Sequence, residues 1–179
     1  IGESGSGKST LINVFLGLLS SQKGTINLLD KKGNFLSYIK HLKISHVPQE
    51  VFLFDDTLKN NICIPGVDKI NEKLLKKVIK EADLEKFVNK LPSGLNTKVG
   101  ERGAKVSGGQ KQRIGIARSL YHETDLLIFD EITSSLDKES EDRIMKVIAK
   151  IKSKTILLIT HKKSNLKICD KIINLDKLN

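Results

Sequence analysis

The C-terminal third of the chain shows the clearest pattern of apolar and polar positions. Continuous apolar runs at residues 126–129 and 156–159 predict buried strands, and residues 171–175 predict another. Between the first two runs, apolar residues recur every three or four positions, which predicts a helix with the stripe Ile144, Val147, Ile148 and Ile151. Because continuous apolar strands separated by helices are typical of parallel sheets covered on both faces, the pattern predicts an α/β fold.

The N-terminal part adds elements of the same kind. Residues 10–16 predict a helix, residues 25–29 predict a strand, and residues 44–47 predict a short strand that runs into a loop at Pro48. We therefore expect a mainly parallel sheet flanked by helices, built from both ends of the chain.

A helical segment separates these two parts. Apolar positions 74, 75, 78, 79 and 82 fall on one face of a helix with Asn71 as its candidate N-cap, and further helices are predicted over residues 84–90 and 107–120. We expect a core of residues 1–48 and 118–179, with residues 49–117 forming an inserted α-helical subdomain.

Length and composition limit the classes of protein. Of the 179 residues, 39% are hydrophobic and 29% charged, which suits a globular domain with a substantial core. No apolar run approaches the length of a membrane span. The net charge of +10 comes from lysines spread among acidic residues, and aromatic residues are scarce at 4%, so we expect no nucleic-acid partner. Cys63 and Cys169 lie far apart and lack metal-ligand spacing.

The most specific motif lies at the N-terminus, where residues 2–10 fit the pattern G-x-x-x-x-G-K-[ST] and an apolar helix follows. In this pattern backbone N–H groups surround a phosphate at the positive end of the helix, the lysine contacts the β- and γ-phosphates, and the next hydroxyl ligates Mg²⁺. A flexible turn with an incidental lysine is the alternative. The full pattern favours nucleotide binding by Gly2, Glu3, Ser4, Gly5, Ser6, Gly7, Lys8, Ser9 and Thr10, with Ser9 on the metal. Such a loop normally follows a strand, so we expect a fragment of a longer protein.

Further candidates follow predicted strands. Asp130 and Glu131 end the strand at 126–129, at the edge where ligands bind in parallel sheets. Asp130 suits Mg²⁺ coordination and Glu131 suits polarising a water for attack on a γ-phosphate, although such pairs also cap helices. His161 is expected at the same edge, either contacting a γ-phosphate or in a structural role. Gln49 could ligate Mg²⁺, but taken alone it favours an ordinary loop residue.

A second candidate anion site begins at Ser107. Two glycines behind this serine, at the start of a predicted helix, would expose N–H groups and a hydroxyl. One nucleotide cannot easily serve both helix ends, because the first loop already surrounds it. A symmetric dimer, in which each chain's second site closes over its partner's nucleotide, resolves this. A glycine-loosened helix start is the alternative.

Taken together, the motifs resemble the nucleotide-binding domain of the ATP-binding cassette (ABC) transporters, in the family's order and over essentially the whole chain. Residues 2–10 resemble Walker A, Gln49 the Q-loop, residues 107–110 the signature and residues 127–130 Walker B. Glu131 resembles the catalytic glutamate, residues 135–137 the D-loop and His161 the switch histidine.

The resemblance implies a P-loop ATPase that takes ATP and Mg²⁺. By it, the catalytic residues are Glu131, His161 and Gln49, and the metal ligands are Ser9, Gln49 and Asp130. It also implies a head-to-tail dimer in which a second nucleotide-binding domain contributes nucleotide contacts through Ser107, Gly108, Gly109, Gln110 and Asp137.

Residues 51–58 and 99–103 resemble those of exporter-type cassettes, in which the two segments face the coupling helices of the membrane domains. The resemblance therefore implies an exporter or flippase ATPase at the cytoplasmic face of the cell membrane, with transmembrane domains expected on the same polypeptide. One alternative is a soluble ABC-type ATPase acting on DNA or ribosomes, which the lack of heptads and paired cysteines disfavours. A non-hydrolysing regulatory cassette is disfavoured by the presence of Lys8, Glu131 and His161 together.

Overall fold

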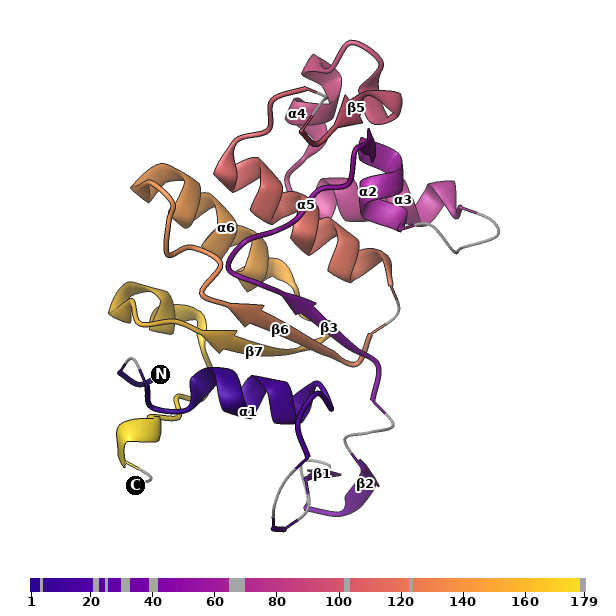
Figure 1. Cartoon of the computed structure of the whole chain (residues 1–179). Coiled ribbons are helices and arrows are strands. Elements are labelled where there is room, and N and C mark those ends of the chain that lie inside the picture. The colour runs from indigo at the N-terminus through magenta and orange to yellow at the C-terminus, as the bar shows by residue number, and fades with distance from the viewer. Residues whose placement is uncertain are drawn as a thin grey trace.

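The computed structural model describes residues 1–3, 5–20, 23–24, 26–29, 33–38, 42–64, 70–101, 104–122 and 124–177. Among these residues, the central sheet has three parallel strands in the order β3 (Ile44–Val47), β6 (Leu126–Asp130) and β7 (Thr155–Ile159). The strands run in step, because Ile44 pairs with Leu126 and Leu126 pairs with Thr155. They therefore end at the same edge of the sheet (Figure 1).

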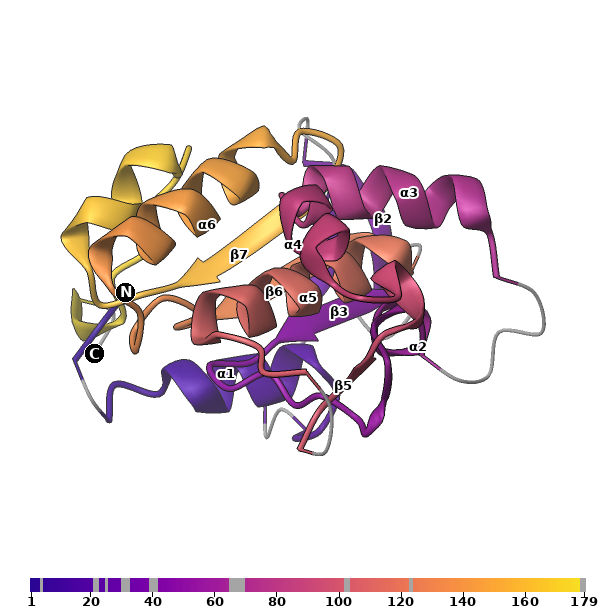
Figure 2. The same cartoon turned by 90° about the horizontal axis from the view of Figure 1, so that it is seen from above.

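Helices cover both faces of this sheet, as the sequence predicts. Alternate residues of β6 point to opposite faces: Leu127 and Phe129 pack with α5 (Gly108–Tyr121) and α6 (Lys138–Lys150), whereas Ile128 packs with Ile12 of α1 (Lys8–Phe15). These side chains are fully buried or nearly so. Figure 2 shows α5 lying over β6 and β3, on the face opposite α1. The α/β prediction is confirmed.

The remaining helices gather around α5, away from α1 (Figure 1). They are α2 (Leu58–Cys63), α3 (Glu72–Glu81) and α4 (Glu85–Lys90). Asn71 caps α3 as predicted, because its side chain accepts a hydrogen bond of 3.0 Å from the Leu74 N–H. Since α5 carries residues on both sides of position 117, the predicted boundary of the helical subdomain falls within one helix.

Two short antiparallel pairs complete the described strands. β1 (Asn27–Leu29) pairs with β2 (Phe35–Tyr38), and β4 (Asp56–Thr57) pairs with β5 (Lys98–Val99), close to the 3₁₀ helix η2 (Gly94–Asn96). β1 lies within the predicted strand at 25–29, although position 25 is outside the described residues. The second pair was not predicted, and it brings two segments some forty positions apart in sequence side by side.

The predicted strand at residues 171–175 is wrong. Residues 171–174 have no assigned secondary structure and follow the 3₁₀ helix η3 (Lys163–Ile168), and Leu175 begins the 3₁₀ helix η4 (Leu175–Lys177). The backbone of this segment meets the other end of the chain, because the Ile1 amino group donates to Ile173 O at 2.7 Å and Leu175 N–H donates to Ile1 O at 2.9 Å. Pairing with a single residue does not build a ladder, so apolar character alone does not make a strand here.

Crossing a bilayer takes about 20 consecutive apolar residues in a helix. Within the described ranges, no helix combines the length and the apolar character that a membrane span requires.

Replacing Gly115 with Ala tests how closely α5 packs on the sheet. At an unconstrained helix position this change would stabilise the helix by about 1 kcal/mol. Here a Cβ would lie 2.7 Å from Cγ2 of Val51 and 3.1 Å from Cγ1 of Val47, and both side chains are stiff at χ1. We expect Gly115→Ala to lower the free energy of unfolding by roughly 1–3 kcal/mol, measured by urea denaturation.

Val51→Ala removes the nearest obstructing carbon and serves as the control for this change. The double variant should be less destabilised than the sum of the two single changes. If the single variant Gly115→Ala had the same free energy of unfolding as wild type, the contact with Val51 would not limit the packing of α5.

A second test concerns the N-cap of α6, Asp137, whose carboxylate accepts a hydrogen bond of 2.9 Å from the Ser140 N–H. That bond, followed by one from the Ser140 side chain, lowers the pKa of Asp137 below its ordinary value. Because the folded-state pKa is the lower one, the carboxylate stabilises the fold above the unfolded value of about 3.9 and loses this effect as the pH falls through the folded value.

We therefore expect Asp137→Ala to lower the melting temperature at neutral pH and to differ progressively less from wild type as the pH falls below about 4. Thermal unfolding followed by circular dichroism measures this. Asp142→Ala, which removes an exposed carboxylate of the same helix but no cap, is the matched control. A difference that persists undiminished at low pH would contradict the assigned role.

Candidate functional site

The loop before α1 has the conformation expected of a phosphate loop. Gly5 and Gly7 have φ angles of 86° and 89°, and Gly7 is the left-handed residue that caps α1. The turn is closed by the hydrogen bond from Ser6 N–H to Glu3 O at 3.2 Å. The Lys8 ammonium donates to Gly2 O at 2.8 Å and to Glu3 O at 2.6 Å, so it lies over the loop. Ser4 is outside the described residues.

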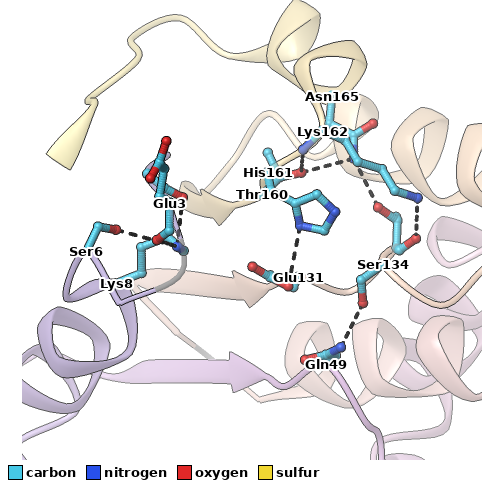
Figure 3. A network of polar contacts seen from close by, with 12 residues as sticks. Glu3, Ser6, Lys8, Gln49, Glu131, Ser134, Thr160, His161, Lys162 and Asn165 are labelled. Atoms are coloured by element: carbon cyan, nitrogen blue, oxygen red, sulfur yellow. Dashed lines mark hydrogen bonds and ion pairs between the residues drawn. The ribbon is translucent and has the colours of Figure 1, made fainter. Parts of the chain in front are cut away.

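The ends of β6 and β7 bring the predicted carboxylates and histidine together. Asp130 pairs with Ile159 across the two strands, and the Glu131 N–H donates to Ile159 O at 3.0 Å. The His161 side chain then lies next to that of Glu131, with Nδ1 3.5 Å from Oε2 (Figure 3). Glu131 has a φ of 47°, which is unusual for a residue other than glycine and typical of functional sites.

A cavity of about 530 Å³ combines the loop with these strand ends. The residues that line it are Gly2, Glu3, Gly5, Gly7, Lys8, Ser9, Thr10, Gln49, Asp130, Glu131 and His161. A larger cavity of about 670 Å³ lies at the opposite ends of β6 and β7, and its lining includes none of the predicted site residues. We therefore take the smaller cavity as the candidate site, since the chemistry and not the size distinguishes it.

Gln49 reaches this cavity from the end of β3 and is held at both its side chain and its backbone. Its side-chain amide donates to Ser134 Oγ at 3.0 Å (Figure 3), and its carbonyl accepts a bond of 2.5 Å from Gln112 Nε2. Gln112 is almost completely buried in α5. Sequence reasoning missed both partners, because neither belongs to a motif.

His46 is another neighbour that the sequence did not indicate. It lies on β3 opposite Ile128, and its Nε2 is 3.9 Å from Asp130 Oδ2. In the described part of the chain this buried nitrogen has no hydrogen-bond partner. The sequence offered one signal: His46 lies on the predicted strand at 44–47, three residues before Gln49, and is therefore near the carboxyl edge of the sheet.

The second predicted anion site lies elsewhere. Residues 107–110 do not line the cavity, and Ser107 and Gln110 bind one another in a capping box at the start of α5, with bonds of 2.8 Å and 3.3 Å. A Cβ on Gly109 would lie 3.1 Å from the Ser140 side chain, and one on Gly108 would lie 3.1 Å from Leu136. The glycines therefore also let the start of α5 approach the start of α6, which Asp137 caps.

The geometry of the cavity has a definite chemical meaning. Backbone amides at a helix start and an ammonium group attract phosphate, while hydroxyl, carboxylate and amide oxygens are the ligands that Mg²⁺ prefers. A carboxylate can orient a water for attack on a phosphate, and an imidazole beside that carboxylate can contact the same phosphate. Ser107 and Asp137, by contrast, have ordinary helix-capping roles within the chain. The Ser107 hydroxyl can still donate its proton, and Asp137 has a second carboxylate oxygen that can bind a further group.

Comparison with known proteins agrees with this site. The model of the ABC transporter family matches residues 1–134. The chain is 41% identical to a Rickettsia prowazekii protein named as an export ATP-binding/permease protein, over 99% of this chain and 31% of that protein. It is 39% identical to an ATP-dependent lipid A-core flippase of Vibrio vulnificus, over 98% of this chain and 30% of the flippase.

Among solved structures, a bacterial Atm1-family ABC exporter with ATP bound matches with a TM-score of 0.81 and 34% identity, over 98% of this chain and 31% of that one. The chain thus spans less than a third of the length of each of these relatives. With a phosphate loop, a carboxylate pair and a histidine lining one cavity, and with the family model matching well over half of its length, the chain belongs to the ABC transporter family.

Proposed function

We propose that this chain binds and hydrolyses ATP and thereby powers a membrane exporter. The observation that carries the proposal is the single cavity in which the phosphate loop meets Gln49, Asp130, Glu131 and His161. The names of the relatives, an export protein and a flippase, favour an exporter over an ATPase that acts on DNA or ribosomes.

In this proposal the loop and the start of α1 hold the phosphates of ATP. The loop amides and the Lys8 ammonium bind phosphate oxygens, which requires Lys8 to exchange its bonds to Gly2 O and Glu3 O for bonds to the nucleotide. Ser9, Gln49 and Asp130 supply a hydroxyl, an amide and a carboxylate oxygen for Mg²⁺, and all three line the cavity. Bound Mg²⁺ would supply positive charge that offsets the charge of the phosphates.

Glu131 and His161 would act on the reacting groups. Glu131 accepts a hydrogen bond from the attacking water and orients it, and His161 contacts the γ-phosphate. Their separation of 3.5 Å supports this assignment, because it allows one γ-phosphate and its water to touch both side chains. Gln49 contributes an uncharged contact to the same water.

The complete site would require a second nucleotide-binding domain arranged head to tail. Residues 107–110 do not line the cavity of their own chain. The amides of Gly108 and Gly109 take no part in the capping box, so they and the Ser107 O–H can donate to a nucleotide held by a partner. In this arrangement Gly108, Gly109 and Gln110 would complete the nucleotide contacts at the start of α5, and Asp137 would link the two nucleotide sites of the dimer.

Coupling to a membrane domain would use the surface formed by β4 and β5. Their pairing brings together the exporter-like segments at 51–58 and 99–103, of which positions 102 and 103 lie outside the described residues. Phe52 and Phe54 are exposed there at 65% and 44%. Aromatic side chains exposed on one segment suit a protein partner. We propose that this surface receives the coupling helices of transmembrane domains at the cytoplasmic face of the membrane, and that residues 49–117 form the subdomain that moves with them.

Glu131→Gln in the complete transporter tests the proposed chemistry. The amide keeps the size of the side chain but cannot accept a proton, so we expect ATP hydrolysis to fall by at least about 100-fold. ATP should still bind, and the variant should accumulate as an ATP-bound dimer of the two domains. Phosphate release measures the first effect, and cross-linking between Ser107→Cys and Ser6→Cys of the paired domains measures the second.

Glu139→Gln is the matched control, because Glu139 is an exposed carboxylate of α6 outside the cavity. It should hydrolyse ATP at the wild-type rate. Undiminished hydrolysis by Glu131→Gln would contradict the role of Glu131, and hydrolysis-deficient protein whose two domains never associate would contradict the shared site.

A further inference from the structure

The side chains of Glu131 and His161 lie on two turns beyond the last paired residues of β6 and β7, where one backbone bond, from the Glu131 N–H to Ile159 O at 3.0 Å, is the last link between the strands. The pairing of β6 with β7 ends at Asp130 and Ile159, and each side chain extends from the loop that follows. Glu131 has a φ of 47°, a conformation that persists only where the surroundings impose it. The relative position of the two side chains therefore depends on contacts beyond the strands.

A group of polar residues joins the two turns (Figure 3). We call it the polar cluster, and its members are Thr133, Glu141, Thr160, Lys162 and Asn165. Apart from Lys162, each is at most 4% exposed. Polar side chains buried to this extent are costly unless hydrogen bonds satisfy them.

Lys162 makes the connection between the turns. Its ammonium donates to the carbonyl oxygen of Thr133 at 2.8 Å and to Glu141 Oε2 at 3.0 Å. Lys162 is the residue directly after His161, and Thr133 comes two residues after Glu131. Glu141 lies on α6, where its side chain is only 5% exposed. The Lys162 ammonium therefore fixes the turn of His161 against the turn of Glu131 by a hydrogen bond and against α6 by an ion pair.

Asn165 and Thr160 complete the cluster. The Asn165 side-chain amide donates to Thr133 Oγ1 at 3.0 Å and to Thr160 Oγ1 at 3.4 Å, and the same Thr160 oxygen accepts from the Lys162 N–H at 3.0 Å. Both residues adjacent to His161 are thus held, while its imidazole is left exposed toward the cavity.

Stability alone does not account for this arrangement. An ion pair with a buried carboxylate adds little to stability compared with apolar residues of the same volume, because the buried charge loses its hydration. The second oxygen of Glu141 is buried without a partner among the described residues, which makes the site more costly. What the cluster does supply is a fixed geometry at the point where a displacement of about 1 Å strongly affects a reaction.

We propose that Lys162 is a positioning residue, which holds His161 against Glu131 through Thr133 and Glu141 and so sets the rate of ATP turnover rather than the affinity for ATP. The inference rests on the proposed function. Lys162 does not line the cavity, so it acts through His161 and Glu131 and does not touch the nucleotide.

The test compares variants of the complete transporter by steady-state ATP hydrolysis. Lys162→Met combined with Glu141→Leu removes the ion pair without leaving an unpaired buried carboxylate. We expect kcat to fall about tenfold or more while the KM for ATP stays within about twofold. Lys162→Arg retains donors for both acceptors, so its kcat should stay within about threefold of wild type. Lys163→Met, at the exposed neighbouring lysine, is the matched control and should leave kcat unchanged.

A folded double variant with wild-type kcat would overturn the inference, and so would a raised KM at unchanged kcat, which would assign the cluster to binding. If the double variant fails to fold, Lys162→Gln replaces it, because its side-chain amide keeps a donor group. We expect the kcat of this variant to fall by less than that of the double variant, and a wild-type kcat would overturn the inference. Wild-type transporter that releases no phosphate would instead overturn the proposed function, and this inference with it.

Discussion

The parallel pairing of β6 with β7 is the constraint on which the candidate site depends. Because the two strands run in the same direction and in step, Glu131 and His161, thirty residues apart, emerge at one edge. The same sheet holds α1 through the contact of Ile12 with Ile128, which brings the phosphate loop to that edge. An antiparallel pair would send the two strand ends in opposite directions. The direction of pairing therefore places the phosphate loop and the candidate catalytic residues around one cavity, which no single motif does.

Sequence reasoning succeeded where burial or capping fixes the pattern. β3, β6, β7 and the helices from α3 to α5 lie within about two residues of their predicted bounds, as expected where apolar periodicity reflects contact with a core. α6 carries the predicted stripe apart from Ile151, which is its C-cap. The approach of Asp130, Glu131 and His161 to one edge also followed from chain order, since parallel strands expose their carboxyl ends together, whereas Gln49 was expected there only from the family resemblance. The roles of these residues remain predictions.

Other features depend on contacts that leave no local pattern. β4 and β5 contain two residues each, which is too short for any periodicity. Residues 171–175 include three apolar residues, Ile172, Ile173 and Leu175, but a strand also needs a neighbour to pair with, and the sequence does not reveal it. The polar cluster escaped notice because Lys162 and Glu141 look like residues of solvated faces. One signal was available: Glu141 lies three positions before Ile144 and seven before Ile148, on the apolar stripe of α6, where an acidic residue requires a buried partner.

Helix α5 connects the cavity to the second candidate anion site, residues 107–110, which lies at the N-terminus of this helix. On successive turns, Gln112 donates to the carbonyl of Gln49, Gly115 packs against Val51, and Arg118 donates to the carbonyl of Phe52 at 3.0 Å. Residues 107–110 precede the first of these turns on the same helix. A displacement of the start of α5 along its axis would therefore break the bond to Gln49 or carry Gln49 with it, since close packing at Gly115 leaves no room for the helix to slide over the segment.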